Sequence, residues 1–428
     1  MKNVKERLKS LERKNIGKQW RAIDSDDSLS TREKLGKLVD RSLTRKKKSE
    51  DRAPAAGNAR PENLRKSVVV KDFFYSLDAP FGRVSLREWQ AVTPQALTIL
   101  AHNPDFAGVD PLKLIYVDSE TTGLAGGTGT IPFMLGFGFF NRDAFQVKVF
   151  VLCDLNREDL FLQAVDDFLE ASGFAGSVTF NGRAFDFPLL ETRYILQRRR
   201  FPLLRLPHLD FLFPARTLWK HTYDSRKLGH LGEQLLGISR SDDVDAAAIP
   251  ALYFNFLHSN AFSLLEPVIE HNALDIVGLA AVTLLACRYL EDVSLTADEG
   301  EVLGVGRLWE QNGWLEEAAA SYRAARESAN RQEVKVLASR RLSTLLKRKK
   351  LYEEALELWR ELSAARDPQA QREISVHYEH RERNYAMALS FVEKALSGTA
   401  LSPARRQEME KRLMRLQRKI AKLEEKEE

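Results

Sequence analysis

The chain has 428 residues, 44% of them hydrophobic, and its 65 Lys and Arg against 60 Asp and Glu give a formal net charge of +5. This length predicts two or three domains of roughly 100 to 200 residues each, and the two cysteines exclude both a disulfide framework and a four-cysteine zinc site. The sequence shows no N-terminal apolar run and no stretch of roughly 20 apolar residues, so we expect a soluble, cytoplasmic protein that does not enter a membrane.

The charge is unevenly distributed along the chain. Residues 1–66 contain 20 Lys and Arg against 10 Asp and Glu, whereas residues 100–288 contain 16 against 22. The first 66 residues hold few large apolar side chains, so we predict a basic, disordered arm. Such an arm serves either as a tether for nucleic acid or as a solubilising tail. An acidic region follows it, and acidic side chains need solvent or cations to offset their charge.

Short apolar runs bounded by Gly, Asn or Asp begin near residue 112 and predict strands, and segments with apolar residues every three or four positions predict helices. Asn156 is the expected N-cap of the first of these helices. In chain order, the pattern predicts strands at residues 112–117, 131–140 and 145–152, a helix at 156–172, a strand at 177–180, and helices at 187–197 and 266–290. We therefore expect residues 67–297 to form a mixed α/β sheet whose first strand lies near the centre.

The remainder, residues 298–428, is Ala-, Glu- and Arg-rich and predicts an all-α domain. Ala318, Ala355 and Ala388 stand in similar local sequences, 37 and 33 residues apart. Each is followed four positions later by a larger apolar residue: Tyr322, Trp359 and Val392. This period is close to that of tetratricopeptide repeats, which bind protein partners, and the alternative is an ordinary helical bundle. A charged helix at residues 402–428 is expected to cap the array.

The strongest chemical signal is the pair Asp118 and Glu120, which comes directly after the first predicted strand. Side chains at i and i+2 of an extended chain point to the same side, so both carboxylates can meet one site. Neighbouring carboxylates repel unless a cation lies between them, and Mg²⁺ or Mn²⁺ prefers such oxygen ligands. Two later segments add carboxylates, Asp186 after the fourth strand and Asp275, which shares a helical face with His271 four residues before it.

These acidic segments resemble the ordered motifs of the DEDD 3′ to 5′ exonucleases. Their combination resembles the YprB-like branch of ribonuclease-H-like bacterial proteins over about residues 70–290. The resemblance rests on these strings: Glu120-Thr-Thr-Gly-Leu124 followed by Gly126-Gly-Thr-Gly129, Leu-Pro-His208-Leu-Asp210, Lys227-Leu-Gly-His-Leu, Ile249-Pro-Ala-Leu-Tyr253 and Glu270-His-Asn-Ala-Leu-Asp275. The resemblance implies an α/β ribonuclease-H-like mixed sheet of the exonuclease type, followed by an all-α helical-repeat domain.

The resemblance also implies a metal-dependent 3′ to 5′ exonuclease that hydrolyses phosphodiester bonds with two divalent cations, Mg²⁺ or Mn²⁺. Asp118 would bridge the two ions, Glu120 and Asp275 would complete one shell, and Asp186 would support the other. His271 would orient or deprotonate the attacking water. Its spacing to Asp275 is that of the tyrosine type of these enzymes, so His271 alternatively only hydrogen-bonds a ligand.

Residues around the acids are expected to contact the end of a single-stranded DNA or RNA substrate: Thr121, Thr122, Gly123, Leu124, Asn181 and Lys227. The glycine loop at residues 123–129 lacks a following Gly-Lys-Ser/Thr and is no P-loop; it is either a close backbone approach to the terminal nucleotide or a hairpin turn. His208 and Asp210 would support the metal ligands or cap a loop, and Lys227 would meet phosphates or solvent. The alternative to an enzyme is an inactive nucleic-acid-binding scaffold whose repeats recruit a protein.

Overall fold

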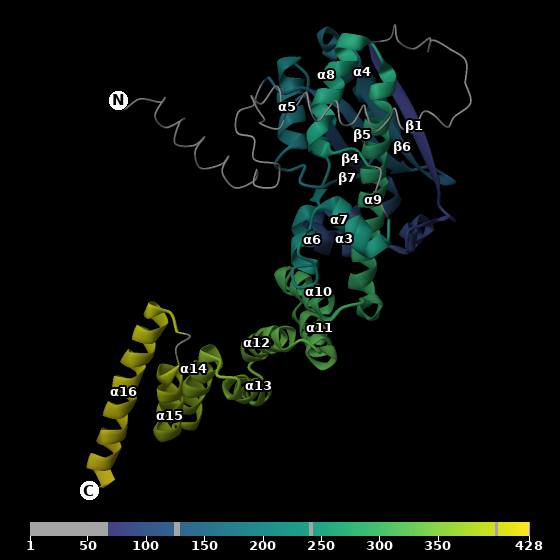
Figure 1. Ribbon diagram of the computed structural model, residues 1–428. Coiled ribbons are helices and arrows are strands. Elements are labelled where there is room, and N and C mark those ends of the chain that lie inside the picture. The colour runs from purple at the N-terminus through teal and green to yellow at the C-terminus, as the bar shows by residue number, and fades with distance from the viewer. Residues whose placement is uncertain (1–66, 124–128, 239–242, 399–400, 428) are drawn as a thin grey trace, which may run out of the picture.

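The computed structural model describes residues 67–123, 129–238, 243–398 and 401–427. An α/β part forms one end of the molecule, and a row of helices leads away from it to the C-terminus (Figure 1). The expected disordered arm, residues 1–66, lies outside the described residues, as does most of the glycine loop, including Leu124.

The strands are β1 (Val68–Ser76), β2 (Pro80–Phe81), β3 (Val84–Ser85), β4 (Leu114–Thr121), β5 (Pro132–Phe140), β6 (Ala144–Leu152), β7 (Gly176–Thr179) and β8 (His208–Asp210). The α-helices of the α/β part are α3 (Pro94–Ala101), α4 (Glu158–Ser172), α5 (Asp186–Leu196), α6 (Leu212–Leu218), α7 (Leu228–Leu231), α8 (Ile249–Ser259) and α9 (Glu266–Glu291). The helices that follow are α10 (Glu299–Gln311), α11 (Leu315–Ser328), α12 (Gln332–Arg348), α13 (Tyr352–Ala364), α14 (Pro368–His377), α15 (Tyr385–Ser397) and α16 (Pro403–Glu427).

Six strands form one mixed sheet in the order β1, β6, β5, β4, β7, β8. The strands β1, β6, β5 and β4 pair antiparallel, whereas β4, β7 and β8 pair parallel. The strand expected first in the chain is β4, and its central position is confirmed. The sequence patterns gave no prediction for the edge strands β1 and β8.

The two faces of the sheet are covered by different helices, and β5 shows why. Gly136 and Gly138 face α9, because a Cβ on either would come within 2.4 Å of Asn272 or Ile276 on that helix. Phe137, which lies between them, points to the opposite face, where it packs against Phe168 of α4. Small residues on one side and large rings on the other therefore allow α9 to lie directly on the strands.

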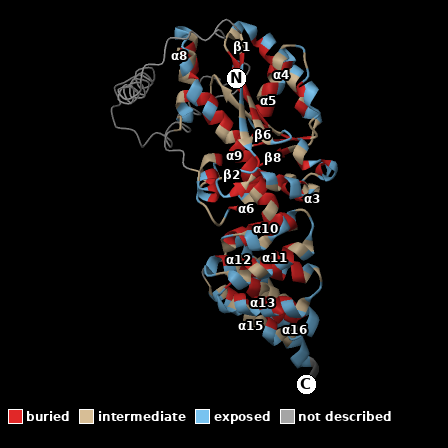
Figure 2. Cartoon of the chain, turned by 90° about the vertical axis from the view of Figure 1, so that its right-hand side faces the viewer, coloured by how far each residue is buried: buried red, intermediate tan, exposed pale blue. Residues whose placement is uncertain are grey.

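Helix α9 is the long core helix of the α/β part and contacts β4, β5 and β6. Residues 262–291 are long and apolar enough to cross a membrane by length and composition, but most of this segment is buried inside the protein. In Figure 2, which colours the chain by burial, α9 carries buried residues. The apolar character of α9 is thus explained by burial on the sheet.

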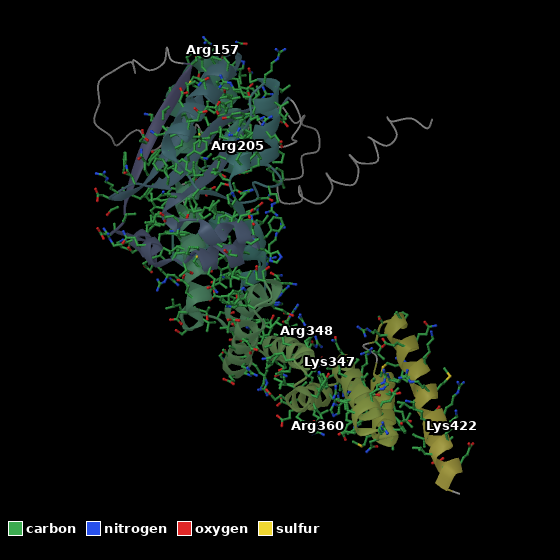
Figure 3. The ribbon with its side chains drawn as sticks, turned by 180° about the vertical axis from the view of Figure 1, so that it is seen from behind. Arg157, Arg205, Lys347, Arg348, Arg360 and Lys422 are labelled. Atoms are coloured by element: carbon green, nitrogen blue, oxygen red, sulfur yellow. The ribbon has the colours of Figure 1, made fainter. Side chains whose placement is uncertain are left out.

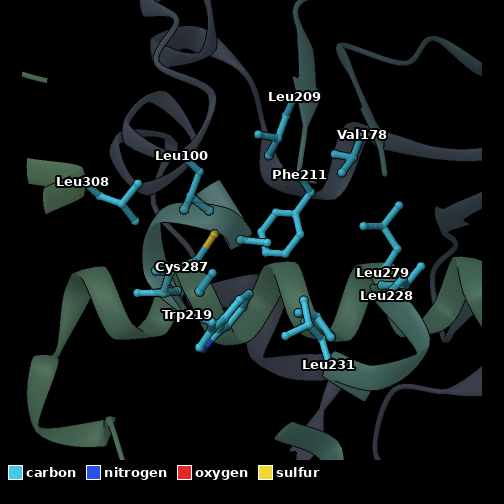
Figure 4. Packing of buried hydrophobic residues seen from close by; sticks show 14 of the residues in the cluster. Leu100, Val178, Leu209, Phe211, Trp219, Leu228, Leu231, Leu279, Cys287 and Leu308 are labelled. Carbon is cyan, nitrogen blue, oxygen red and sulfur yellow. The ribbon is translucent and has the colours of Figure 1, made fainter. Parts of the chain in front are cut away.

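The helices after residue 298 are packed onto the α/β part. Gly304 of α10 lies so close to α6 that a Cβ would meet the Leu218 carbonyl oxygen at 2.1 Å. Figure 4 shows Leu308 of α10 in the same apolar cluster as Phe211 and Trp219. The alanines and larger apolar residues of the internal repeat are all buried: Ala318, Tyr322, Ala355, Trp359, Ala388 and Val392. The predicted all-helical C-terminal region is confirmed.

Two details differ from the sequence-based expectations. Asn156 does not cap a helix; it lies in a short 3₁₀ turn that Asp154 caps by accepting the Asn156 N–H at 3.0 Å, and α4 begins at Glu158. Strand β4 does not end before the acids but continues to Thr121, because its backbone keeps pairing with β5. The acidic pair therefore belongs to a rigid strand and not to a loop.

Candidate active site

Strand β4 places two carboxylates on the face that α9 covers. Asp118 pairs with Gly136 and Glu120 pairs with Met134 in the antiparallel ladder with β5. Directly paired residues share a face, so Asp118 lies on the same side as Gly136, next to α9, and Glu120 lies on that side two residues further on. The shared direction predicted for the two acids follows from this register.

Asp118 is held by α9 and sits in a strongly unfavourable environment for a charge. The Asn272 side-chain amide donates a hydrogen bond to Asp118 Oδ2 at 2.8 Å. Burial raises the pKa of the Asp118 carboxyl well above its usual range, and the negative charges of Glu120, Asp186 and Asp275 act in the same direction. Such a carboxylate is stable in its charged form only when positive charge is nearby.

Glu120 shares this environment. Burial raises the pKa of the Glu120 carboxyl to about 7. The charges of Asp275 and Asp186 raise it as well, whereas His271 acts in the opposite direction. The four acids predicted from the sequence therefore lie within electrostatic reach of one another, although they come from β4, α5 and α9.

Asp186 begins α5 and is buried, with 8% of its surface exposed. It accepts a hydrogen bond from the Ser119 hydroxyl, which connects it to the residue between the two acids of β4. Burial raises the pKa of the Asp186 carboxyl to about 6, even though the Ser119 hydrogen bond lowers it. Ser119 was not among the predicted site residues.

The loop before Asp186 is fixed by Asp210 at the end of β8. Asp210 accepts backbone N–H bonds from Asn181 at 2.7 Å and from Arg183 at 3.0 Å. Asn181 has a left-handed backbone (φ 69°), which Asn adopts more readily than most residues. The loop-capping alternative for Asp210 is therefore the one observed, and through this loop Asp210 sets the position of Asp186.

His271 lies between two carboxylates on the other side of the site. Its Nδ1 is 2.6 Å from Asp243 Oδ1, and its Nε2 is 3.6 Å from Asp275 Oδ2, one helical turn along α9. His271 is 9% exposed, so its ring orientation is set by these neighbours. Asp243 was not predicted, because it lies 28 residues before His271 in a loop that carries no recognisable motif.

The remaining predicted residues are placed away from the acids or use their polar groups locally. Thr121 donates its hydroxyl to the Gly123 carbonyl at 2.9 Å, and the Thr122 hydroxyl accepts the Ile131 N–H at 3.0 Å, so both close the base of the β4–β5 hairpin. Lys227 is exposed at the start of α7. Its neighbour Arg226 donates to the carbonyl groups of its own loop.

His208 makes its contacts with β7 and α5. Its Nε2 is 2.8 Å from the Thr179 hydroxyl, and its ring stacks on Phe187 with the ring centroids 4.0 Å apart. Burial lowers the pKa of His208 to about 4, so it is neutral at physiological pH. We assign His208 a packing role between β7, β8 and α5.

The four acidic side chains of the candidate site are of the kind that bind divalent cations. Four carboxylates offer only oxygen ligands, and burial together with neighbouring negative charges raises the pKa values of Asp118, Glu120 and Asp186. No three Asp, Glu, His or Cys side chains in the described ranges stand close enough to hold one ion as they are now placed. The hydrogen bonds to Ser119, Asn272 and Asp243 account for the present positions of these groups.

Comparisons with known proteins agree with this arrangement. A family model described as RNase_H superfamily matches residues 115–286, a span that contains all four acids and His271. The uncharacterized protein YprB of Bacillus subtilis (strain 168) is 30% identical over 361 residues, which cover 82% of this chain and 86% of that protein. The chain belongs to the YprB family. The similarity to YprB covers so much of the chain that it extends beyond residues 115–286 into the C-terminal helices. The α/β part and the helices that follow it therefore occur together in both proteins.

Proposed function

We propose that this YprB-family protein is a divalent-metal-dependent nuclease, and most specifically a 3′ to 5′ exonuclease acting on single-stranded DNA or RNA ends. The observation that carries the proposal is the meeting of Asp118, Glu120, Asp186 and Asp275 from three separate elements, with raised pKa values for the first three. A fold gains no stability from gathering four acids in one place, so the cluster indicates a site for cations and phosphate.

In this proposal, Asp118, Glu120, Asp186 and Asp275 would hold two Mg²⁺ or Mn²⁺ ions. Bound ions would stabilise negative charge on the attacking and leaving oxygens of the phosphodiester. Asn272 would keep Asp118 oriented through its 2.8 Å hydrogen bond, and the loop capped by Asp210 would keep Asp186 facing the strand. The protein's contribution is thus to fix the four acids despite their repulsion.

His271 would act as the general base. In the tautomer whose Nδ1–H donates to Asp243, Nε2 is an acceptor that points toward Asp275. A proton taken from water at Nε2 would create an imidazolium ion that Asp243 stabilises, because the 2.6 Å hydrogen bond then becomes charge-assisted. Asp243 would therefore be a positioning residue that sets the ring orientation.

A second candidate is a scaffold that binds nucleic acid without cutting it and recruits a protein through the helices after residue 298. The observation that favours it is that, among the described residues, no three acidic, histidine or cysteine side chains stand close enough together to hold one ion. Both candidates keep nucleic acid as the ligand, and they differ in whether phosphodiester bonds are broken.

One assay separates the two. Purified protein is incubated with 5′-labelled single-stranded DNA and RNA in Mn²⁺ or Mg²⁺, beside Asp118→Asn and the exposed control Asp143→Asn. We expect a ladder of shortened products from the natural protein and the control and none from Asp118→Asn, whose amide oxygen still accepts the Asn272 bond. Shortened products from Asp118→Asn, or no products from the natural protein, would contradict the proposed nuclease activity at this site. Cutting of circular single strands would indicate an endonuclease.

A further inference from the structure

The last helix carries a dense positive charge that the candidate active site does not use. Between positions 411 and 422, α16 contains six cations and no carboxylate: Lys411, Arg412, Arg415, Arg418, Lys419 and Lys422. Lys411, Arg415, Arg418 and Lys422 follow one another at spacings of four, three and four, which places them on one face of the helix. These residues, with Met414 and Lys419, line a shallow groove that we call the basic face of α16.

The opposite face of α16 is already occupied. Met409 and Leu416 are buried, at 1% and 0% exposed, where α16 packs against α15. Lys422, in contrast, projects from the surface near the free end of the molecule (Figure 3). The basic face therefore points to solvent, and α16 has no large apolar face left with which to enter a lipid surface.

A buried carboxylate organises three of the six cations. Glu379 lies under α16 and contacts Arg412 at 2.5 Å, Arg415 at 2.7 Å and Lys419 at 2.9 Å. Burial alone would raise the pKa of Glu379, but the hydrogen bonds from Lys419 and Arg415 lower it below its usual range. One negative charge thus faces three positive charges, so the cluster keeps a net positive charge while its side chains are held in place.

The other three cations, Lys411, Arg418 and Lys422, are exposed and have no ion-pair partner among the described residues. The nearest carboxylates along the helix lie at the ends of the basic face, where Glu410 directly precedes Lys411 and Glu424 follows Lys422 by two positions. Glu408, one position further back than Met409, pairs with Arg372 and Arg405. The positive charge of the face is therefore not neutralised within the described part of the chain.

We propose that the basic face of α16 binds the sugar-phosphate backbone of a nucleic acid strand, as a second contact at the far end of the molecule from the sheet (Figure 1). The choice of nucleic acid over another polyanion rests on the proposed function. From Lys411 to Lys422 the helix rises roughly 17 Å, a length that covers about five phosphates of one strand of a B-form duplex at about 3.4 Å each. Phosphate contacts of this kind carry no sequence preference, so the face would hold a substrate while its end is processed.

The test measures binding without cleavage. Fluorescence anisotropy of a labelled single-stranded oligonucleotide is recorded with the full chain in EDTA over a range of salt concentrations. The variant Lys411→Glu/Arg418→Glu/Lys422→Glu is compared with a matched control that reverses three exposed, unpaired cations around α12, Lys335→Glu/Arg348→Glu/Lys350→Glu. Because EDTA removes the ions, the result does not depend on whether the protein is a nuclease.

We expect the α16 variant to lose at least tenfold in affinity at low salt. The slope of log K against log salt should fall by about 2, because roughly 0.7 counterions are released per single-strand phosphate and three contacts are lost. An unchanged slope, or an equal loss in the control, would overturn the proposal. Binding of phosphatidylserine vesicles or of a polyglutamate peptide that the α16 variant loses, with oligonucleotide affinity kept, would also overturn it.

Discussion

Asn272 of α9 and Asp118 of β4 lie 154 positions apart in the chain, and the Asn272 amide donates to Asp118 Oδ2 at 2.8 Å. Asn272 is fully buried, and its packing against the sheet leaves no space for a side chain at Gly136. The hydrogen bond favours the charged form of Asp118, whereas burial and the neighbouring acids favour the neutral form. The central acid of the site is therefore supported by the helix that also carries His271 and Asp275.

The substitution Asn272→Asp replaces this donor with a fifth carboxylate. Without metal at neutral to alkaline pH, we expect the free energy of unfolding to fall by about 3 kcal/mol or more, because an unpaired buried charge faces Asp118. Urea unfolding in EDTA measures this loss, and Asn156→Asp, the same change at an exposed position, is the control. Equal stability of the two variants would show that Asn272 does not face a charged site.

The close approach of α9 to β5 gives a second prediction. In Gly136→Ala the new methyl group would lie 1.9 Å from Asn272 Oδ1 and 2.3 Å from Ile276 Cδ1, so α9 must shift. We expect a loss of about 2 kcal/mol in stability and a loss of metal-dependent activity, because overpacking displaces Asn272 from Asp118. Gly108→Ala, where no atom lies within 4 Å of the added carbon, should change neither. An active, stable Gly136→Ala protein would argue against a tight α9–β5 contact.

The parts of the fold that local patterns predicted are those whose burial is visible in the residues themselves. Strand β4 follows from its apolar run, and α9 follows from its length and apolar periodicity. The edge strand β1 was not predicted, because it pairs only with β6 and exposes charged residues such as Lys71 and Asp72. Its pattern depends on a partner that is distant in the sequence.

The residues of the candidate site likewise divide into those that local motifs predict and those that only contacts in the folded chain reveal. Asp118, Glu120, Asp186 and Asp275 stand in motifs and could be found from spacing, and their mutual electrostatic influence agrees with that prediction. Asp243 and Ser119 could not be found, because their roles come from contacts with His271 and Asp186 that only the folded chain creates. The contact of the His208 ring with Phe187 could not be found either, since the motif around His208 does not reveal it.

The raised pKa values predict how stability depends on pH. Glu120 and Asp186 have pKa values of about 7 and about 6 in the fold, against 4.5 and 3.8 as ordinary values. The folded state therefore holds protons that the unfolded chain releases, so stability falls as pH rises through these values. In EDTA, we expect a lower melting temperature at about pH 8 than at about pH 5, and Mn²⁺ should restore stability at the higher pH because it binds the charged site.

This profile has a direct control in Glu120→Gln, which removes one of the two titrating groups. Differential scanning calorimetry should show a weaker decline with pH for this variant in EDTA and a smaller gain from Mn²⁺. A decline of the same size as in the natural protein would place the pH dependence elsewhere in the chain.

The contact between His271 and Asp243 predicts a coupled effect on rate. We expect His271→Ala to remove most of the hydrolysis rate, and Asp243→Asn to lower it by about 10- to 100-fold with KM nearly unchanged, because the ring loses its orienting acceptor. The control is Asp245→Asn, two residues away in the same segment, whose side chain can still cap Ala247. Single-turnover rates in Mn²⁺ measure the three variants.

The double variant decides whether Asp243 acts through His271. If the acid only orients the imidazole, Asp243→Asn has nothing left to disturb once the ring is gone, so His271→Ala/Asp243→Asn should be as slow as His271→Ala alone. If the rate losses of the two single variants multiply in the double variant, Asp243 acts independently of His271. It could do so through its negative charge, which raises the pKa of Glu120. The 2.6 Å contact between Asp243 Oδ1 and His271 Nδ1 favours the first outcome.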